Sequence, residues 1–154
     1  MIESHEEQGK CRTVMVFGVF DGLHDGHLSF LNQAQALGER LIVVVARDES
    51  VMRLKHHLPQ RSCSERINAL IQSELAQEII PGDETEGGWE VIHKYRPDLV
   101  ALGYDQHAMQ IHLLNALPAF PFPCRATVLA PYRPDECHSS LLNACRVETQ
   151  NVTP

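Results

Sequence analysis

The sequence predicts one α/β domain, built as a doubly wound parallel sheet with helices on both faces. Two observations lead to this class. Apolar runs of strand length alternate with segments of helical period from residue 13 to residue 147. The runs at 41–45 and 99–102 are continuously apolar, which is typical of parallel strands covered on both sides. A chain of 154 residues, 44% hydrophobic and 21% charged, is long enough to bury a core of its own.

Apolar periodicity, together with residues that typically start or end helices and strands, predicts each element in turn. The domain should span residues 12–147, between polar tails at 1–11 and 148–154. Strands are expected at 13–17, 41–45, 78–80, 99–102 and 126–130. Helices are expected from Gly26 or His27 to Leu37, in a short piece ending at Leu54, from Ser62 through Ile71, and at 89–95, 106–117 and 139–147. Ser62 and Glu65 have the spacing of a capping box.

Composition argues against several classes of function. The net charge of −7 leaves no general basic surface for nucleic acid. No apolar stretch approaches the ~18 residues of a membrane span, so we expect no membrane partner. The five cysteines form no Cys-x-x-Cys pair, which favours free thiols and a cytoplasmic protein. Cys137 and Cys145 are either a redox pair or two unrelated thiols.

The stretch from Gly18 to His27 joins the first strand to the first helix and carries three glycines and two histidines. Glycine allows backbone conformations, and close approaches to a ligand, that a Cβ would prevent. His24 and His27 are three residues apart, so in a first helical turn their rings point the same way. Two imidazoles at a helix N-terminus suit a phosphate that gains charge during a reaction. The alternative is a glycine-rich turn with two solvated histidines.

Ligands of doubly wound sheets bind beyond the carboxyl ends of the strands, so the segments after the other strands are further candidates. Lys55 follows the second strand and can neutralise a phosphate from a closing loop; its alternative is a solvated surface charge. After the fourth strand, Tyr104 can stack on a base and Asp105 can accept from a ribose hydroxyl or a base amine; the alternative is a structural loop. Ser139 and Ser140 open the last predicted helix, as a second phosphate site or as a plain cap.

The stretch Gly-Val-Phe-Asp-x-x-His-x-Gly-His at 18–27 resembles the signature of the cytidylyltransferase-like nucleotidyltransferases, and so implies a Rossmann-like sheet. Val-Val-Ala-Arg-Asp-Glu-Ser-Val at 44–51 and Gly-Tyr-Asp-Gln at 103–106 resemble the archaeal-type FAD synthases within that superfamily. The chain departs from the family at two points. His56 stands where a glycine usually follows the lysine, and Leu141 or Leu142 stands where a lysine or arginine is common.

The pattern and the resemblance together assign the site residues. Catalytic roles fall to His24, His27 and Lys55. The nucleotide is expected on Gly18, Val19, Phe20, His24, His27, Gly103, Tyr104, Asp105, Ser139 and Ser140. The acceptor is expected on Asp21, Lys55 and Arg66, and for Arg66 a surface salt bridge is nearly as good an interpretation. No residue is assigned to a metal, because no carboxylate cluster marks a metal site.

The resemblance implies a nucleotidyltransferase that moves AMP from ATP to FMN, giving FAD and pyrophosphate. The acceptor phosphate would attack the α-phosphorus directly, and Mg²⁺ or another divalent cation would accompany the triphosphate. Two alternatives stay open. One is a cytidylyltransferase that acts on a small phosphomonoester such as glycerol 3-phosphate, and the other is a nucleotide-binding module without activity. The oligomeric state stays open as well, with a homodimer among the candidates.

Overall fold

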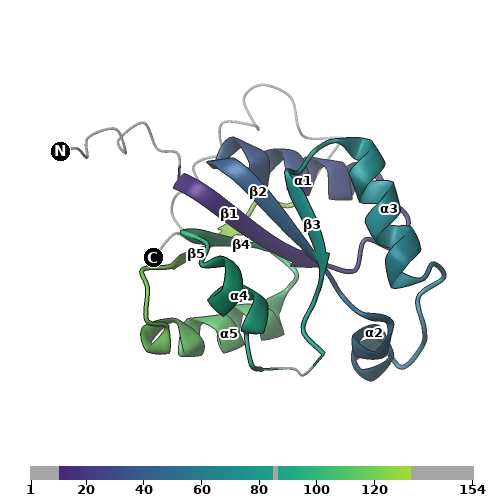
Figure 1. The fold of residues 1–154 in the computed structure, drawn as a ribbon. Helices are drawn as coiled ribbons and strands as arrows, with labels where there is room; N and C mark the ends of the chain where they lie inside the picture. The colour runs from purple at the N-terminus through teal and green to yellow at the C-terminus, as the bar shows by residue number, and fades with distance from the viewer. Residues whose placement is uncertain (1–10, 85–86, 133–154) are drawn as a thin grey trace.

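The computed structural model describes residues 11–84 and 87–132, and within them five strands form one all-parallel sheet (Figure 1). The strand order is β3-β2-β1-β4-β5. The strands are β1 (Cys11–Gly18), β2 (Gly38–Val45), β3 (Glu78–Pro81), β4 (Leu99–Gly103) and β5 (Arg125–Leu129). The helices are α1 (Asp25–Ala36), α2 (Asp48–Lys55), α3 (Cys63–Ser73), α4 (Glu90–Tyr95), α5 (His107–Ala116) and the short 3₁₀ helix η2 (Leu117–Ala119). The predicted α/β class with a doubly wound parallel sheet is confirmed.

Successive residues of the central strands face opposite sides of the sheet, which explains why these strands are apolar without interruption. Val14 and Val16 of β1 lie in a core shared with α1 and α3. Met15, between them in sequence, lies in a second core shared with α4 and α5. Figure 1 shows these two helix pairs on opposite sides of the sheet. The sheet is therefore covered on both faces, as the sequence predicts.

The observed boundaries differ from the predicted ones by a few residues. β1 begins at Cys11, one residue ahead of the predicted domain start. α1 begins at Asp25 rather than at Gly26 or His27, because the ring of His24 caps it. β2 reaches back to Gly38. The predicted helix at 139–147, Cys137, Cys145 and both tails except Cys11 lie outside the described residues.

The chain reverses its direction of winding between β1 and β4. From β1 it proceeds to β2 and β3 on one side, then crosses to β4 and β5 on the other. β1 pairs with both β2 and β4, so the carboxyl ends of β1 and β4, at Gly18 and Gly103, are neighbours. This point is where doubly wound sheets bind their ligands. The loop at 18–27 and the loop after β4 flank it.

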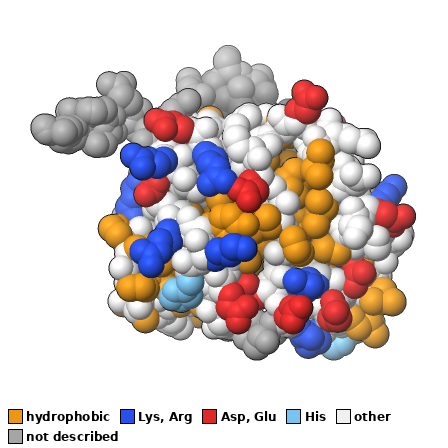
Figure 2. All heavy atoms as spheres, viewed as in Figure 1, with side chains coloured by type: hydrophobic (Ala, Val, Ile, Leu, Met, Phe, Trp, Pro, Cys, Tyr) orange, Lys and Arg blue, Asp and Glu red, His pale blue; other side chains and the backbone are white. Residues whose placement is uncertain are grey.

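Two further observations concern the charge of the surface and the length of the helices. On the face drawn in Figure 2, Lys and Arg side chains are interspersed with Asp and Glu, without a continuous basic area. Among the described residues, no helix has the length and apolar character to cross a membrane.

Candidate active site

His24 and His27 form a capping box at the start of α1. The Nδ1 of His24 accepts from the backbone N–H groups of Gly26 (3.1 Å) and His27 (3.4 Å). In return, the Nδ1 of His27 accepts from the backbone N–H of His24 at 3.4 Å. The two rings stack with centroids 3.8 Å apart. The rings therefore share one side of the helix start, although His24 precedes the helix as its N-cap.

The hydrogen bonds to the His24 ring select one of its tautomers. A ring nitrogen that accepts from an N–H carries no proton, so this geometry uses the imidazole tautomer with its proton on Nε2. In the described part of the chain, no protein group hydrogen-bonds to that Nε2. Gly26 leaves room for the ring, because a Cβ at this position would lie 3.0 Å from His24 Cε1. The capping box thus leaves one N–H donor of His24 for an incoming anion.

Burial favours the neutral form of His27 and lowers the pKa of its ring; the neighbouring His24 ring acts in the same direction, and a hydrogen bond with the Gly22 carbonyl opposes both. A lowered pKa in the folded chain makes a contribution to stability that is fully present above the ordinary value of 6.5 and lost as the pH falls through the folded-state pKa. The neutral capping box should therefore weaken in acid.

We predict that the stability advantage of the natural chain over a His27→Gln variant shrinks as the pH is lowered from about 7.5 to about 5. Urea titrations of both proteins at a series of pH values measure this difference. Comparing the two proteins cancels the contribution of the other histidines. A difference in free energy of unfolding that stays constant or grows in acid would contradict the role of the neutral His27 ring.

Lys55 and Asp105 approach the histidines from two other segments. The charge of Lys55, the last residue of α2, acts to lower the pKa of His27, and the charge of Asp105, in the loop after β4, acts to raise it. The neighbouring Tyr104 is 53% exposed. The loops after β1, β2 and β4 thus converge, so residues predicted separately from three strand ends lie around one site.

Gln106 ties two of these strand ends together, and the sequence analysis gave it no role of its own. Its Oε1 accepts from the backbone N–H of Gly103 at 2.7 Å. Its Nε2 donates to the carbonyl of Phe17 in β1 at 3.0 Å. The amide side chain thereby holds β4 against β1 at the point where the winding reverses. Its position just after a strand end was the only sequence signal for this role.

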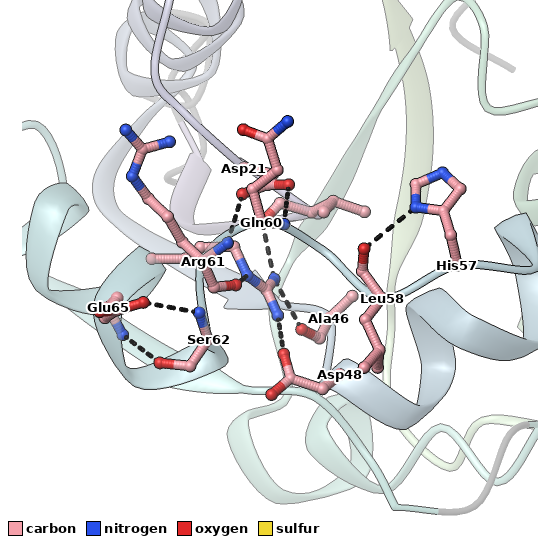
Figure 3. A network of polar contacts seen from close by, with 11 residues as sticks. Asp21, Ala46, Asp48, His57, Leu58, Gln60, Arg61, Ser62 and Glu65 are labelled. Atoms are coloured by element: carbon pink, nitrogen blue, oxygen red, sulfur yellow. Dashed lines mark hydrogen bonds and ion pairs between the residues drawn. The ribbon is translucent and has the colours of Figure 1, made fainter.

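Arg66 is fully buried at the centre of a polar network (Figure 3). Its Nε donates to the carbonyl of Arg61 at 2.9 Å, and its NH1 donates to the carbonyls of Val19 and Ala46, both at 2.8 Å. Its NH2 forms an ion pair with Asp48 Oδ1 at 2.7 Å. The alternative interpretation of Arg66 as a surface salt bridge is right about the ion pair but wrong about its location, because the guanidinium is buried. Since the donors point at protein groups, we now propose that Arg66 positions the site rather than contacts the acceptor.

Asp21 connects the loop at 18–27 to the segment before α3 (Figure 3). One carboxylate oxygen accepts from the backbone N–H of Gln60 at 2.7 Å and the other from that of Arg61 at 3.0 Å. These hydrogen bonds lower the pKa of Asp21 despite the opposing effect of desolvation, and the one from Gln60 has the largest effect. Both oxygens are therefore engaged, and we propose that Asp21 acts on the acceptor site mainly by holding residues 60 and 61 in place.

Phe20 packs below the site. It adopts a positive φ of 55° and is 3% exposed. Its ring fills the space beside Gly18, where a Cβ would lie 2.6 Å from Phe20 Cε2, and lies 5.4 Å from the His27 ring between centroids. Phe20 therefore supports the histidines from the core side. Glycine at position 18 is therefore required for packing against Phe20, in addition to its predicted role of allowing a ligand to approach the backbone.

His56 ends α2 in the left-handed conformation, with φ of 64°. Glycine reaches that conformation at little cost, and it is the residue that the resemblance leads one to expect here. This chain thus keeps the helix end after Lys55 despite the substitution. The remaining predicted site residues, Ser139 and Ser140, lie outside the described residues. Among the described ones, no group of three or more His, Cys, Asp or Glu side chains could hold a metal ion.

Comparisons with known proteins show which family the chain resembles along most of its length. Residues 15–142 match the family model described as cytidylyltransferase-like. FAD synthase of Thermococcus onnurineus is 40% identical over 100 residues, which are 65% of this chain and 66% of that protein. FAD synthase of Methanothermobacter marburgensis is 32% identical over 138 residues, 88% of this chain and 84% of that protein. FAD synthase of Pyrococcus abyssi is 42% identical over 93 residues, 60% of this chain and 63% of that protein. The match thus spans a little less than two thirds of the first and third of these relatives.

A solved structure supports the fold assignment. The lipopolysaccharide core biosynthesis protein of Thermoplasma volcanium superimposes with a TM-score of 0.73 at 28% identity, covering 80% of this chain and 99% of that one. A pantoate-β-alanine ligase of Francisella tularensis superimposes with a TM-score of 0.57 at 12% identity, over 87% of this chain and 65% of that one, which shows the fold alone. The histidine capping box at the start of α1, the switch point beside it and the family match over residues 15–142 lead to one conclusion: the chain belongs to the cytidylyltransferase-like family.

Proposed function

We propose that this protein is a nucleotidyltransferase that transfers AMP from ATP to FMN and releases pyrophosphate. The single observation that carries the proposal is the histidine capping box, which presents an N–H donor at a helix N-terminus beside the switch point. Relatives that are named FAD synthases support FMN as the acceptor. Gly-Tyr-Asp-Gln at 103–106 supports the same acceptor over a small phosphomonoester.

The geometry suits direct attack of one phosphate on another. The nucleotide base would lie by Tyr104 and Asp105, at the end of β4, and its leaving pyrophosphate by the histidines. The acceptor phosphate would lie beside residues 18–21, opposite the leaving group. This phosphate is already ionised near neutral pH, so the reaction needs no general base. The chain's part is to position both phosphates and to stabilise the charge that develops on the leaving group.

We propose that a divalent cation accompanies the triphosphate. Because no cluster of ligand side chains is found among the described residues, we propose that Mg²⁺ enters bound to phosphate oxygens and water. We also keep as proposals a cytoplasmic location, a homodimer and the absence of a nucleic-acid partner. The free thiols of Cys11, Cys63 and Cys124 support the first, and the net charge of −7 supports the last.

The proposal predicts a defined product stoichiometry. Purified protein with Mg²⁺, ATP and FMN should form FAD and pyrophosphate in equal amounts, measured by chromatography and a coupled pyrophosphate assay. Riboflavin in place of FMN should not react, because it lacks the phosphate that attacks. FAD formation from riboflavin at a rate comparable to that from FMN would contradict direct attack by the acceptor phosphate.

Replacing Lys55 by alanine should lower kcat/KM for ATP and FMN by about 10- to 100-fold, because a cation near the His27 ring is removed from the phosphates. Lys94 on α4 is an exposed lysine in another segment and provides the matched control. Steady-state kinetics with each substrate varied in turn measure both variants. Equal kinetic constants for Lys55→Ala and Lys94→Ala would show that Lys55 is only a solvated surface charge.

A further inference from the structure

The backbone of Arg61 is fixed from both sides, just before α3 begins. Its N–H donates to Asp21 at 3.0 Å, and its carbonyl accepts from the buried guanidinium of Arg66 at 2.9 Å. The next residue, Ser62, is the N-cap of α3 and accepts from Glu65. These contacts set the position of the Arg61 Cα relative to the loop at 18–27 without using its side chain.

The side chain of Arg61 reaches back to that loop. A Cβ built on Gly22 would lie 2.9 Å from Arg61 NH1, so the guanidinium rests against bare backbone two residues before His24. Gly22 has a φ of +89°, a conformation that side chains rarely adopt. Figure 3 shows the Arg61 guanidinium directed away from Asp48 and Ala46, and no dashed line ends on it. The absence of a side chain at Gly22 thus leaves space for the Arg61 guanidinium beside the loop at 18–27.

Charge distinguishes Arg61 from the other arginines near the site. Arg66 is buried and paired with Asp48. Arg47 donates to the carbonyl of Gly82 and lies 3.9 Å from Glu84. Arg61 is exposed, and within the described part of the chain no carboxylate forms an ion pair with its guanidinium. Its charge is therefore available to a ligand.

We propose that Arg61 is a phosphate-binding residue of this site, with Lys55 as a second cation. A planar guanidinium can bind a phosphate through two parallel N–H donors, which suits a fixed anion better than a flexible ammonium group does. An acidic chain that binds polyphosphate needs such local positive charge. The phosphate belongs either to the nucleotide or to the acceptor, and this identity rests on the proposed function.

The test uses Arg61→Gln and Arg61→Lys, with Arg12→Gln as control, since Arg12 is an exposed arginine near the start of β1. The dissociation constants of Mg·ATP and of FMN are measured separately, by calorimetry and by flavin fluorescence. Arg61→Gln should weaken the binding of one of these two ligands by at least about 10-fold, and Arg61→Lys should recover part of the lost affinity. The control should bind both normally. The affected ligand identifies the source of the phosphate.

The outcomes separate this inference from the proposed function. Arg61 forms its hydrogen bonds with Asp21 and Arg66 only through its backbone, and its charge affects the pKa of Asp21 less than the hydrogen bonds to that carboxylate do, so Arg61→Gln should keep the urea midpoint of the natural chain. If Arg61→Gln binds both ligands with unchanged affinity, Arg61 is not a phosphate ligand, whatever the enzyme's activity. If affinity is lost but the natural chain forms no FAD, the proposed function fails and the Arg61 inference stands. A natural chain that binds neither ligand would overturn both.

Discussion

Replacing His24 or His27 by alanine should lower kcat by ~10²-fold or more at saturating substrates, because in the proposed mechanism each ring lies where the leaving pyrophosphate gains charge. His24→Asn gives a sharper version of this test. An asparagine side chain can still cap α1, but it lacks the Nε2 donor of the imidazole. This variant should therefore keep the stability of the natural chain and still lose turnover. Single-turnover measurements of pyrophosphate release, together with urea titrations, separate the two effects.

The control for the histidine variants is His112→Ala, an exposed histidine on α5. It should change neither turnover nor stability. The assignment of the pair fails if either alanine variant turns over at a near-normal rate. If His24→Asn is fully active, the ring of His24 serves only as a helix cap.

Replacing Arg66 by methionine should destabilise the protein by ~2–4 kcal/mol. Methionine fills much of the volume but donates no hydrogen bonds. The change strips three backbone carbonyls of a buried donor and leaves Asp48 without its ion-pair partner. Arg66→Lys keeps the charge with fewer donors and should lose only part of this stability. Urea unfolding followed by circular dichroism measures both variants.

Arg40→Met is the matched control for Arg66, because Arg40 forms an exposed ion pair with Glu78. Such surface pairs contribute only about 0–1 kcal/mol. The structural account of Arg66 is wrong if Arg66→Met and Arg40→Met have the same small effect. If Arg66→Lys binds FMN more weakly at unchanged stability, Arg66 contacts the acceptor, as the sequence predicts.

The fold follows largely from patterns that are visible in the sequence. Continuous apolar runs predicted strands buried on both faces, and in the structure Ile42 and Val43 do enter different cores. The spacing of His24 and His27 predicted rings on one side, and they stack. The reciprocal cap between them was not predictable, since Ser, Thr, Asp and Asn are the usual caps and histidine rarely serves as one.

The network around Arg66 is an example of contacts that sequence patterns do not predict. Helical period did carry a signal, because Cys63 and Leu70 lie three and four residues from Arg66 on the buried face of α3. An arginine on such a face needs partners, but its acceptors come from three separate segments that only the folded chain brings together. The same holds for Arg61, whose side chain meets Gly22 across 39 positions of sequence.

The most direct test of the proposed activity compares two substrate pairs on one preparation of the protein. We predict that kcat/KM for FMN with Mg·ATP exceeds that for glycerol 3-phosphate with Mg·CTP, both measured by pyrophosphate release. Faster turnover of glycerol 3-phosphate with CTP would contradict the FMN assignment and favour a cytidylyltransferase. If no phosphomonoester releases pyrophosphate with either nucleotide, the protein is not a nucleotidyltransferase of this kind.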